Sequence, residues 1–123
     1  MTTLIECIPN VSEGRRAEVV AAIRGAALAA GPGVLLLDWT SDADHNRSVL
    51  TFLGDGPGLL RAMEAMVAEA LVHVDLTKHE GEHPRLGAVD VIPFVPIRGA
   101  SAADCVARAK ELAAEIGVPI QWV

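Results

Sequence analysis

The chain has 123 residues, 51% of them hydrophobic and 21% charged, which excludes intrinsic disorder and predicts one domain with a buried core. Ten Lys and Arg residues against sixteen Asp and Glu give a formal net charge of −6, which argues against a nucleic-acid partner. No apolar run reaches the length of a membrane helix, and no secretory signal pattern is visible, so we expect no membrane partner either.

The hydrophobic pattern of the first half of the chain predicts one helix among three strands. Residues 4–8 form a short apolar run typical of a strand, and residues 17–30 carry apolar side chains at helical spacing. Residues 34–37 are continuously apolar, which predicts a strand buried on both faces. A polar loop over residues 40–46 then leads to a strand over residues 47–53.

The second half of the chain alternates helices and strands. Residues 55–71 predict a helix with Asp55 as its N-cap. Residues 89–95 predict a strand, and Pro93 and Pro96 indicate an edge position or a strand end. Residues 101–116 predict a helix that starts with a Ser-Ala-Ala-Asp capping box, and residues 118–123 predict a last strand.

The predicted order of elements is β-α-β-β-α-β-α-β. Its first six elements match the split βαβ, ferredoxin-like arrangement. We therefore expect an α/β (α+β) fold in which helices pack on one face of a mixed β-sheet. Residues 1–123 form one predicted domain, and since the sequence stops on an apolar predicted strand, we expect this domain to be incomplete at its C-terminal end.

The cysteine content points to a reducing compartment. Cys7 and Cys105 are far apart in the sequence and no CxxC pair is present. Such scattered cysteines are typical of free, buried thiols. We therefore expect a cytoplasmic protein.

The first polar segment, residues 9–16, joins a predicted strand to a predicted helix. Asn10 or Ser12 could satisfy the free amides at the start of the helix, as capping residues do. The same amides could instead bind an anion. The sequence leaves both interpretations open.

The second polar segment joins two predicted strands. Asp42, Asp44 and Asn46 are residue types common in turns. A turn does not require His45 and Arg47 beside two acids, however. All five are therefore candidate binding residues.

The third polar segment, residues 77–87, concentrates two His, two Glu, one Lys and one Arg between an apolar helix and an apolar strand. An imidazole titrates near neutral pH, so His79 or His83 could accept and return a proton. A neighbouring acid such as Glu82 could orient the ring. Arg85 could bind a carboxylate through its two parallel N–H groups.

The same segment satisfies the H-E-x-x-H pattern of zinc hydrolases at residues 79–83. That pattern binds zinc because a helix places both histidines on one face. Gly81 within the pattern and Pro84 after it disfavour a helix, and no third ligand pattern follows. We expect no metal, and zinc analysis separates this alternative from metal-free proton transfer.

The three polar segments and their flanks resemble, in order, the formiminotransferase (glutamate formimidoyltransferase) family. The resemblance lies in residues 5–15, residues 42–49 and residues 79–94, the last containing the sequence G-E-H-P-R. One such stretch would be modest support. Three in register extend the resemblance over essentially the whole chain.

The resemblance implies transfer of a formimino group from N-formimino-L-glutamate to N5 of tetrahydrofolate in histidine degradation; some relatives transfer a formyl group instead. It implies His83, the histidine of G-E-H-P-R, as the general base and acid, and tetrahydrofolate as co-substrate. The candidates for substrate and folate binding are the remaining polar residues of the three segments: Asn10, Asp42, Asp44, His45, Asn46, Arg47, His79, Glu82 and Arg85.

Two departures from the family pattern affect what the resemblance implies. Family members carry an acid two residues after the aspartate that ends the strand, here Asp38, but this chain has Thr40, so Asp42 or Asp44 would have to replace it. The family's transferase unit also has two similar subdomains with the substrates between them. This chain resembles most of the first subdomain only, and we expect it to carry half of the site. A C-terminal subdomain or a second copy of the chain would complete it. The alternative is a non-catalytic folate-binding or scaffold module of the same fold.

Overall fold

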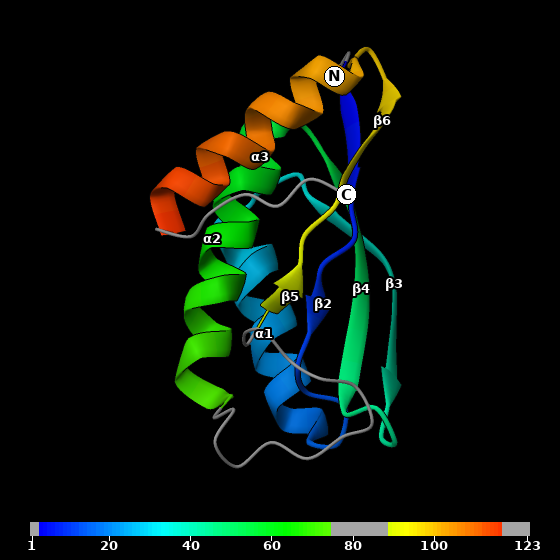
Figure 1. The fold of residues 1–123 in the computed structure, drawn as a ribbon, viewed down its shortest axis with the longest axis vertical. Helices are drawn as coiled ribbons and strands as arrows, with labels where there is room; N and C mark the ends of the chain where they lie inside the picture. Colours follow the sequence, from blue (N-terminus) through cyan, green and yellow to red (C-terminus); the bar gives the residue numbers. More distant parts are fainter. Residues whose placement is uncertain (1–2, 75–88, 117–123) are drawn as a thin grey trace.

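The computed structural model describes residues 3–74 and 89–116, which form a sheet with helices on one side of it (Figure 1). The elements follow in the order β1 (Leu4–Cys7), β2 (Asn10–Val11), α1 (Ala17–Ala30), β3 (Leu35–Asp42), β4 (Arg47–Gly54), α2 (Gly56–His73), β5 (Val89–Val91), β6 (Phe94–Arg98) and α3 (Ala102–Ile116). The prediction of an α+β fold with helices on one face is confirmed.

The six-stranded sheet is organised around β4, which pairs with β3 on one side and with both β1 and β2 on the other. β1 pairs in turn with β6, and β2 with β5. β1 and β2 thus pair with successive parts of β4. They are separated near Pro9, whose ring nitrogen has no N–H to donate. All of these pairs are antiparallel, as in a ferredoxin-like sheet, whereas a mixed sheet was expected. The predicted strand 118–123 lies outside the described residues.

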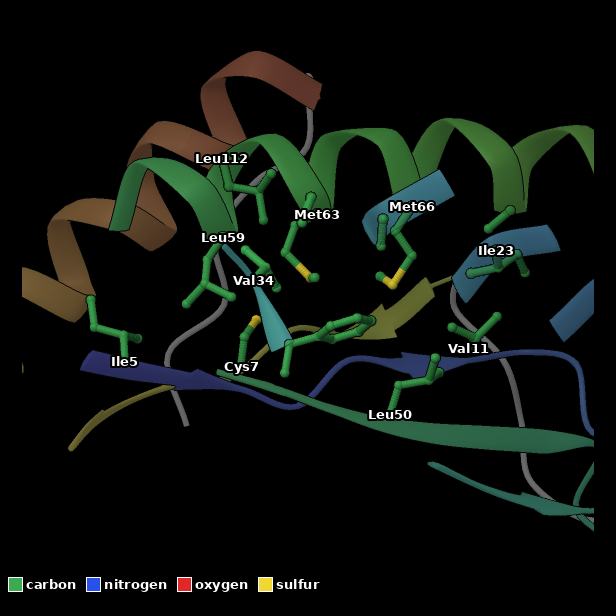
Figure 2. Packing of buried hydrophobic residues seen from close by; sticks show 14 of the residues in the cluster. Ile5, Cys7, Val11, Ile23, Val34, Leu50, Leu59, Met63, Met66 and Leu112 are labelled. Carbon is green, nitrogen blue, oxygen red and sulfur yellow. The ribbon is translucent and has the colours of Figure 1, made fainter. Parts of the chain in front are cut away.

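The hydrophobic core lies between the sheet and the helices. Alternate residues of β1 and β4 point to the helices, so that Ile5, Cys7, Leu50 and Phe52 are almost fully buried. They pack against side chains of α1, α2 and α3 such as Ile23, Leu59, Met63, Met66 and Leu112 (Figure 2). The prediction of free, buried thiols is confirmed for Cys7 and Cys105, and burial raises the pKa of the Cys7 thiol well above its ordinary value.

The prediction of a strand buried on both faces over residues 34–37 is wrong. β3 begins at Leu35 and pairs only with β4 among the described residues, and Leu35, Leu37 and Trp39 are 58%, 54% and 45% exposed. A register shift between Leu36 and Asp38 interrupts its alternation. An uninterrupted apolar run is typical of a strand buried on both faces, but the run itself does not show which strands are covered by neighbouring elements.

The predicted loop over residues 40–46 is shorter in the structure. β3 continues to Asp42 and pairs with β4 up to Arg47, which leaves residues 43–46 as a tight turn. The hydroxyl groups of Ser41 and Ser48 are 2.8 Å apart across this hairpin. The predicted strand 89–95 is likewise divided, into β5 and β6, at Pro93.

The predicted caps of α2 and α3 are confirmed. The Asp55 carboxylate accepts a hydrogen bond from the Gly58 amide at 2.7 Å, as an N-cap residue should. At α3, the Asp104 amide donates to the Ser101 hydroxyl at 3.2 Å and the Ser101 amide donates to the Asp104 carboxylate at 2.8 Å, which is the reciprocal pattern of a capping box. None of the helices within residues 3–74 and 89–116 is long and apolar enough to cross a membrane.

Candidate functional site

Two polar segments that are distant in the sequence meet at one end of the sheet. They are residues 12–16, between β2 and α1, and residues 42–48, around the turn between β3 and β4; together they are called the loop–hairpin cluster. The Gly14 amide donates to the Asn46 side-chain oxygen at 2.8 Å, and Arg15 Nε donates to the Ala43 carbonyl at 2.8 Å. Ser48 Oγ also donates to the Glu13 carbonyl. The first and second polar segments of the sequence therefore form one unit.

Backbone geometry explains two residue types in this cluster. Asn46 has a positive φ of 51°, a conformation that asparagine adopts more readily than most residues. Gly14 lies against the backbone of the hairpin, and a Cβ atom there would lie 2.4 Å from both the Arg47 nitrogen and the Asp42 oxygen. The close approach of the two segments thus requires glycine at position 14.

A buried carboxylate organises the loop of the cluster. Glu13 is only 4% exposed, and its Oε2 accepts hydrogen bonds from the amides of Arg15 and Arg16 at 3.0 and 2.9 Å. Its Oε1 is 2.7 Å from the Arg16 guanidinium. Burial alone would raise the pKa of Glu13. The hydrogen bonds from Arg15 and Arg16 and the Arg16 charge together lower it by more, so the pKa of Glu13 lies below its ordinary value.

This arrangement corrects two expectations for residues 9–16. The N-cap residue of α1 is Arg16, which makes no side-chain capping bond, and Asn10 Nδ2 donates to the Ile8 carbonyl at 3.3 Å instead of capping the helix. An anion is not expected at the amides of Arg15 and Arg16, because the Glu13 carboxylate already occupies them.

Arg16 also connects the cluster to α2. Its Nη2 atom donates to the carbonyl of His73, the last residue of α2, at 2.8 Å. The His73 ring itself lies 2.9 Å from Glu69 on the same helix. The cluster therefore holds the C-terminal end of α2, after which the G-E-H-P-R segment follows in the sequence.

An acid–imidazole pair lies in the hairpin turn. Asp42 Oδ2 is 2.6 Å from His45 Nδ1, and Asp42 Oδ1 accepts the amides of Asp44 and His45 at 3.0 and 3.2 Å. The hydrogen bond from the His45 ring lowers the pKa of the Asp42 carboxyl. Asp42 thereby fixes the orientation of the imidazole.

The sheet surface opposite the helices, here called the open face, brings predicted site residues together. Because Ser48, Leu50 and Phe52 point to the helices, the intervening residues of β4 and their partners point the other way. Asn10, Asp42 and Arg47 share this face, as do Asp38 and Thr40, the positions where the family pattern places its acids. Arg47 makes no ion pair with another residue of the described ranges.

His79, Glu82, His83 and Arg85 lie outside the described residues, and their assignment remains a prediction from the sequence. Within the described residues, no group of three or more His, Cys, Asp or Glu side chains could hold a metal ion. Glu13, Gly14 and Arg16 were not predicted as site residues. An acid placed just before a helix was the available signal for Glu13, since helix N-termini favour negative charge.

A cavity of about 420 Å³ lies at the other end of the sheet, where α2 and α3 begin. Arg108 lines it and packs against Gly56, and Asp55 and Asp104 lie beside them. Both carboxylates bind backbone amides as helix caps, which accounts for their position. None of the predicted site residues lines this cavity.

Comparison with known proteins decides the family. The sequence pattern of the formiminotransferase domain, N-terminal subdomain, matches residues 4–122. The chain belongs to this family. It is 46% identical to a glutamate formimidoyltransferase of Streptococcus pyogenes serotype M1 and 43% identical to a formimidoyltransferase-cyclodeaminase of Sus scrofa, each over 98% of this chain. A glutamate formimidoyltransferase of Thermoplasma acidophilum is 43% identical over 96% of the chain.

The chain of this formiminotransferase subdomain spans only part of these relatives. It covers 41% of the Streptococcus protein, 40% of the Thermoplasma protein and 23% of the pig protein. The relatives thus contain further sequence that has no counterpart in residues 1–123.

Proposed function

We propose that the protein containing this subdomain transfers a formimino group from N-formimino-L-glutamate to N5 of tetrahydrofolate, a reaction of histidine degradation. The observation that carries this proposal is the 46% identity, over 98% of the chain, to a protein named glutamate formimidoyltransferase. The match extends over the three polar segments, whose residue types in this chain suit proton transfer and carboxylate binding.

The proposed chemistry requires proton transfer at two nitrogen atoms. N5 of tetrahydrofolate attacks the formimino carbon and gives a tetrahedral intermediate. A base then removes the proton from N5, and an acid protonates the glutamate nitrogen as its bond to that carbon breaks. In this proposal His83 performs both steps, because one imidazole can accept the first proton and deliver it to the leaving nitrogen.

The open face and the loop–hairpin cluster form half of the proposed site. Asn10, Asp42 and Arg47 lie on this face, and Arg47 is the cation available for a substrate carboxylate. Because the chain covers only 41% of the Streptococcus relative, the opposing wall is proposed to come from a C-terminal subdomain or from a second copy of the chain.

Two further features belong to the same proposal. The proposed reaction needs no metal, since it consists of attack by a neutral amine, two proton transfers and departure of the protonated glutamate nitrogen as its bond to the formimino carbon breaks. A cytoplasmic location is supported by the two unpaired, buried cysteines.

The test is an assay of the full-length protein and of residues 1–123 with N-formimino-L-glutamate and tetrahydrofolate. Turnover by the full-length protein, unaffected by a chelator, is the expected result. Folate binding without transfer by the full-length protein would instead support a binding or scaffold module. Stoichiometric zinc whose removal abolishes activity would support the zinc hydrolase alternative.

A further inference from the structure

In addition to Asp38 and Asp42 of β3, the open face carries a carboxylate whose directly opposed neighbours are apolar. Glu6 lies in β1 between the buried residues Ile5 and Cys7, so its side chain points away from the helices. Its direct cross-strand partners are Leu53 in β4 and Val95 in β6. Leu35 of β3 pairs with Leu53 and extends this apolar area toward the edge of the sheet.

The Glu6 side chain has no hydrogen bond or ion pair to another residue of the ranges 3–74 and 89–116. Directly opposed side chains in a sheet lie about 5 Å apart, so Leu53 and Val95 shield the carboxylate on both sides without offering a donor. A carboxylate that becomes covered without a donor is costly. Any layer that closes over the open face must therefore bring N–H groups to Glu6.

We propose that Glu6 binds the pyrimidine edge of the tetrahydropterin ring of folate, an inference that rests on the proposed function. The 2-amino group and the N3–H of this edge are two parallel donors in one plane, which match the two oxygen atoms of a carboxylate. With its edge at Glu6, the ring extends to one side of β1, where its flat face packs on Leu53 and Leu35.

The surroundings of Glu6 favour the pterin over the other substrate of the proposed reaction. N-formimino-L-glutamate also presents N–H donors, but its formimino group is small and lies close to two carboxylates, which the charge of Glu6 disfavours. In tetrahydrofolate, the p-aminobenzoyl group separates the carboxylates from the pterin. A planar heterocycle uses both the carboxylate and the apolar area around it. In β1, only Glu6 combines a charged group with such neighbours.

The test measures ligand binding to the full-length protein and to its Glu6→Gln variant, which keeps the size of the side chain. The probes are 6-methyltetrahydropterin, which has the ring only, and p-aminobenzoyl-glutamate, which has the tail only. The variant should bind the ring about 10- to 100-fold more weakly, the range expected on losing hydrogen bonds to a charged group, and the tail with unchanged affinity. Glu18→Gln, on the exposed start of α1, is the matched control and should change neither.

A modified ligand sharpens the test. Tetrahydrofolate in which a methyl group replaces the 2-amino group should bind the wild-type protein about 10-fold more weakly than tetrahydrofolate does, and Glu6→Gln should no longer distinguish the two.

Equal loss of ring and tail binding in Glu6→Gln, or affinities within twofold of wild type, would overturn the inference. So would a lower melting temperature of the variant with unchanged ring binding, because Glu6 would then pair with a protein side chain. These measurements need no turnover, so a protein that binds the ring through Glu6 but transfers no formimino group contradicts the proposed function alone.

Discussion

Replacing His83 by alanine in the full-length protein is expected to lower kcat for formimino transfer by about 10²- to 10⁴-fold, the usual contribution of a general acid–base residue. The proposed reaction moves one proton from N5 and delivers one to the glutamate nitrogen, and alanine can do neither. Steady-state kinetics with both substrates measures the effect, and the melting temperature shows whether the variant folds.

His73→Ala is the matched control for this substitution. The His73 side chain pairs with Glu69 on α2, and only its backbone carbonyl bonds to the cluster through Arg16. Its kcat should stay within about twofold of wild type, since exposed ion pairs contribute little. Near-normal turnover of the His83 variant would contradict the proposed role of that histidine.

Replacing Gly14 by alanine is expected to destabilise the protein by about 2–3 kcal/mol, at the upper end of the cost of overpacking. The added Cβ would lie 2.4 Å from Arg47 N and Asp42 O, which are backbone atoms of a paired hairpin and cannot rotate away. The loop and the hairpin must therefore separate, which lengthens the bond from Gly14 to Asn46. Urea unfolding monitored by circular dichroism measures the change.

Gly25→Ala provides a control of opposite sign. Gly25 lies within α1, is exposed, and has no atom within 4 Å of the position of an added Cβ. Alanine should stabilise the helix by about 0.5–1 kcal/mol through its higher helix propensity. A Gly14→Ala variant as stable as wild type would show that the two segments are not in close contact.

The buried Glu13 makes stability depend on pH in a defined direction. Its pKa in the folded protein lies below the ordinary value of 4.5, so the folded state favours the charged form. The resulting stabilisation is complete above about pH 4.5 and is lost as the pH falls through the lowered pKa. The difference in unfolding free energy between wild type and Glu13→Gln should thus shrink from pH 7 to pH 3; a constant difference would contradict it.

The elements that the sequence predicted well are those determined by local signals. The caps at Asp55 and at Ser101 with Asp104 depend on residues within one helical turn, and both occur as expected. The position of β3 in the described sheet depends on which strands pair with each other, and the apolar run 34–37 carries no information about this pairing.

In the candidate site, too, the sequence predicted local features but not long-range contacts. The sequence identified His45 and Arg47, next to two acids, as unusual in a turn, and the structure pairs His45 with one of these acids, Asp42. It did not reveal Gly14, because the need for glycine there comes from contacts with a hairpin about thirty residues away. Such long-range contacts leave no periodic pattern in the chain.

The exposed margin formed by β3 has a practical consequence for anyone who produces this subdomain alone. Its outer backbone groups lack a neighbouring strand among the described residues, and Leu35, Leu37 and Trp39 stand beside them. The unpaired N–H and C=O groups of such an edge strand can pair with strands of other molecules. Low solubility of the purified fragment would therefore arise at β3 and would not by itself indicate misfolding of the core.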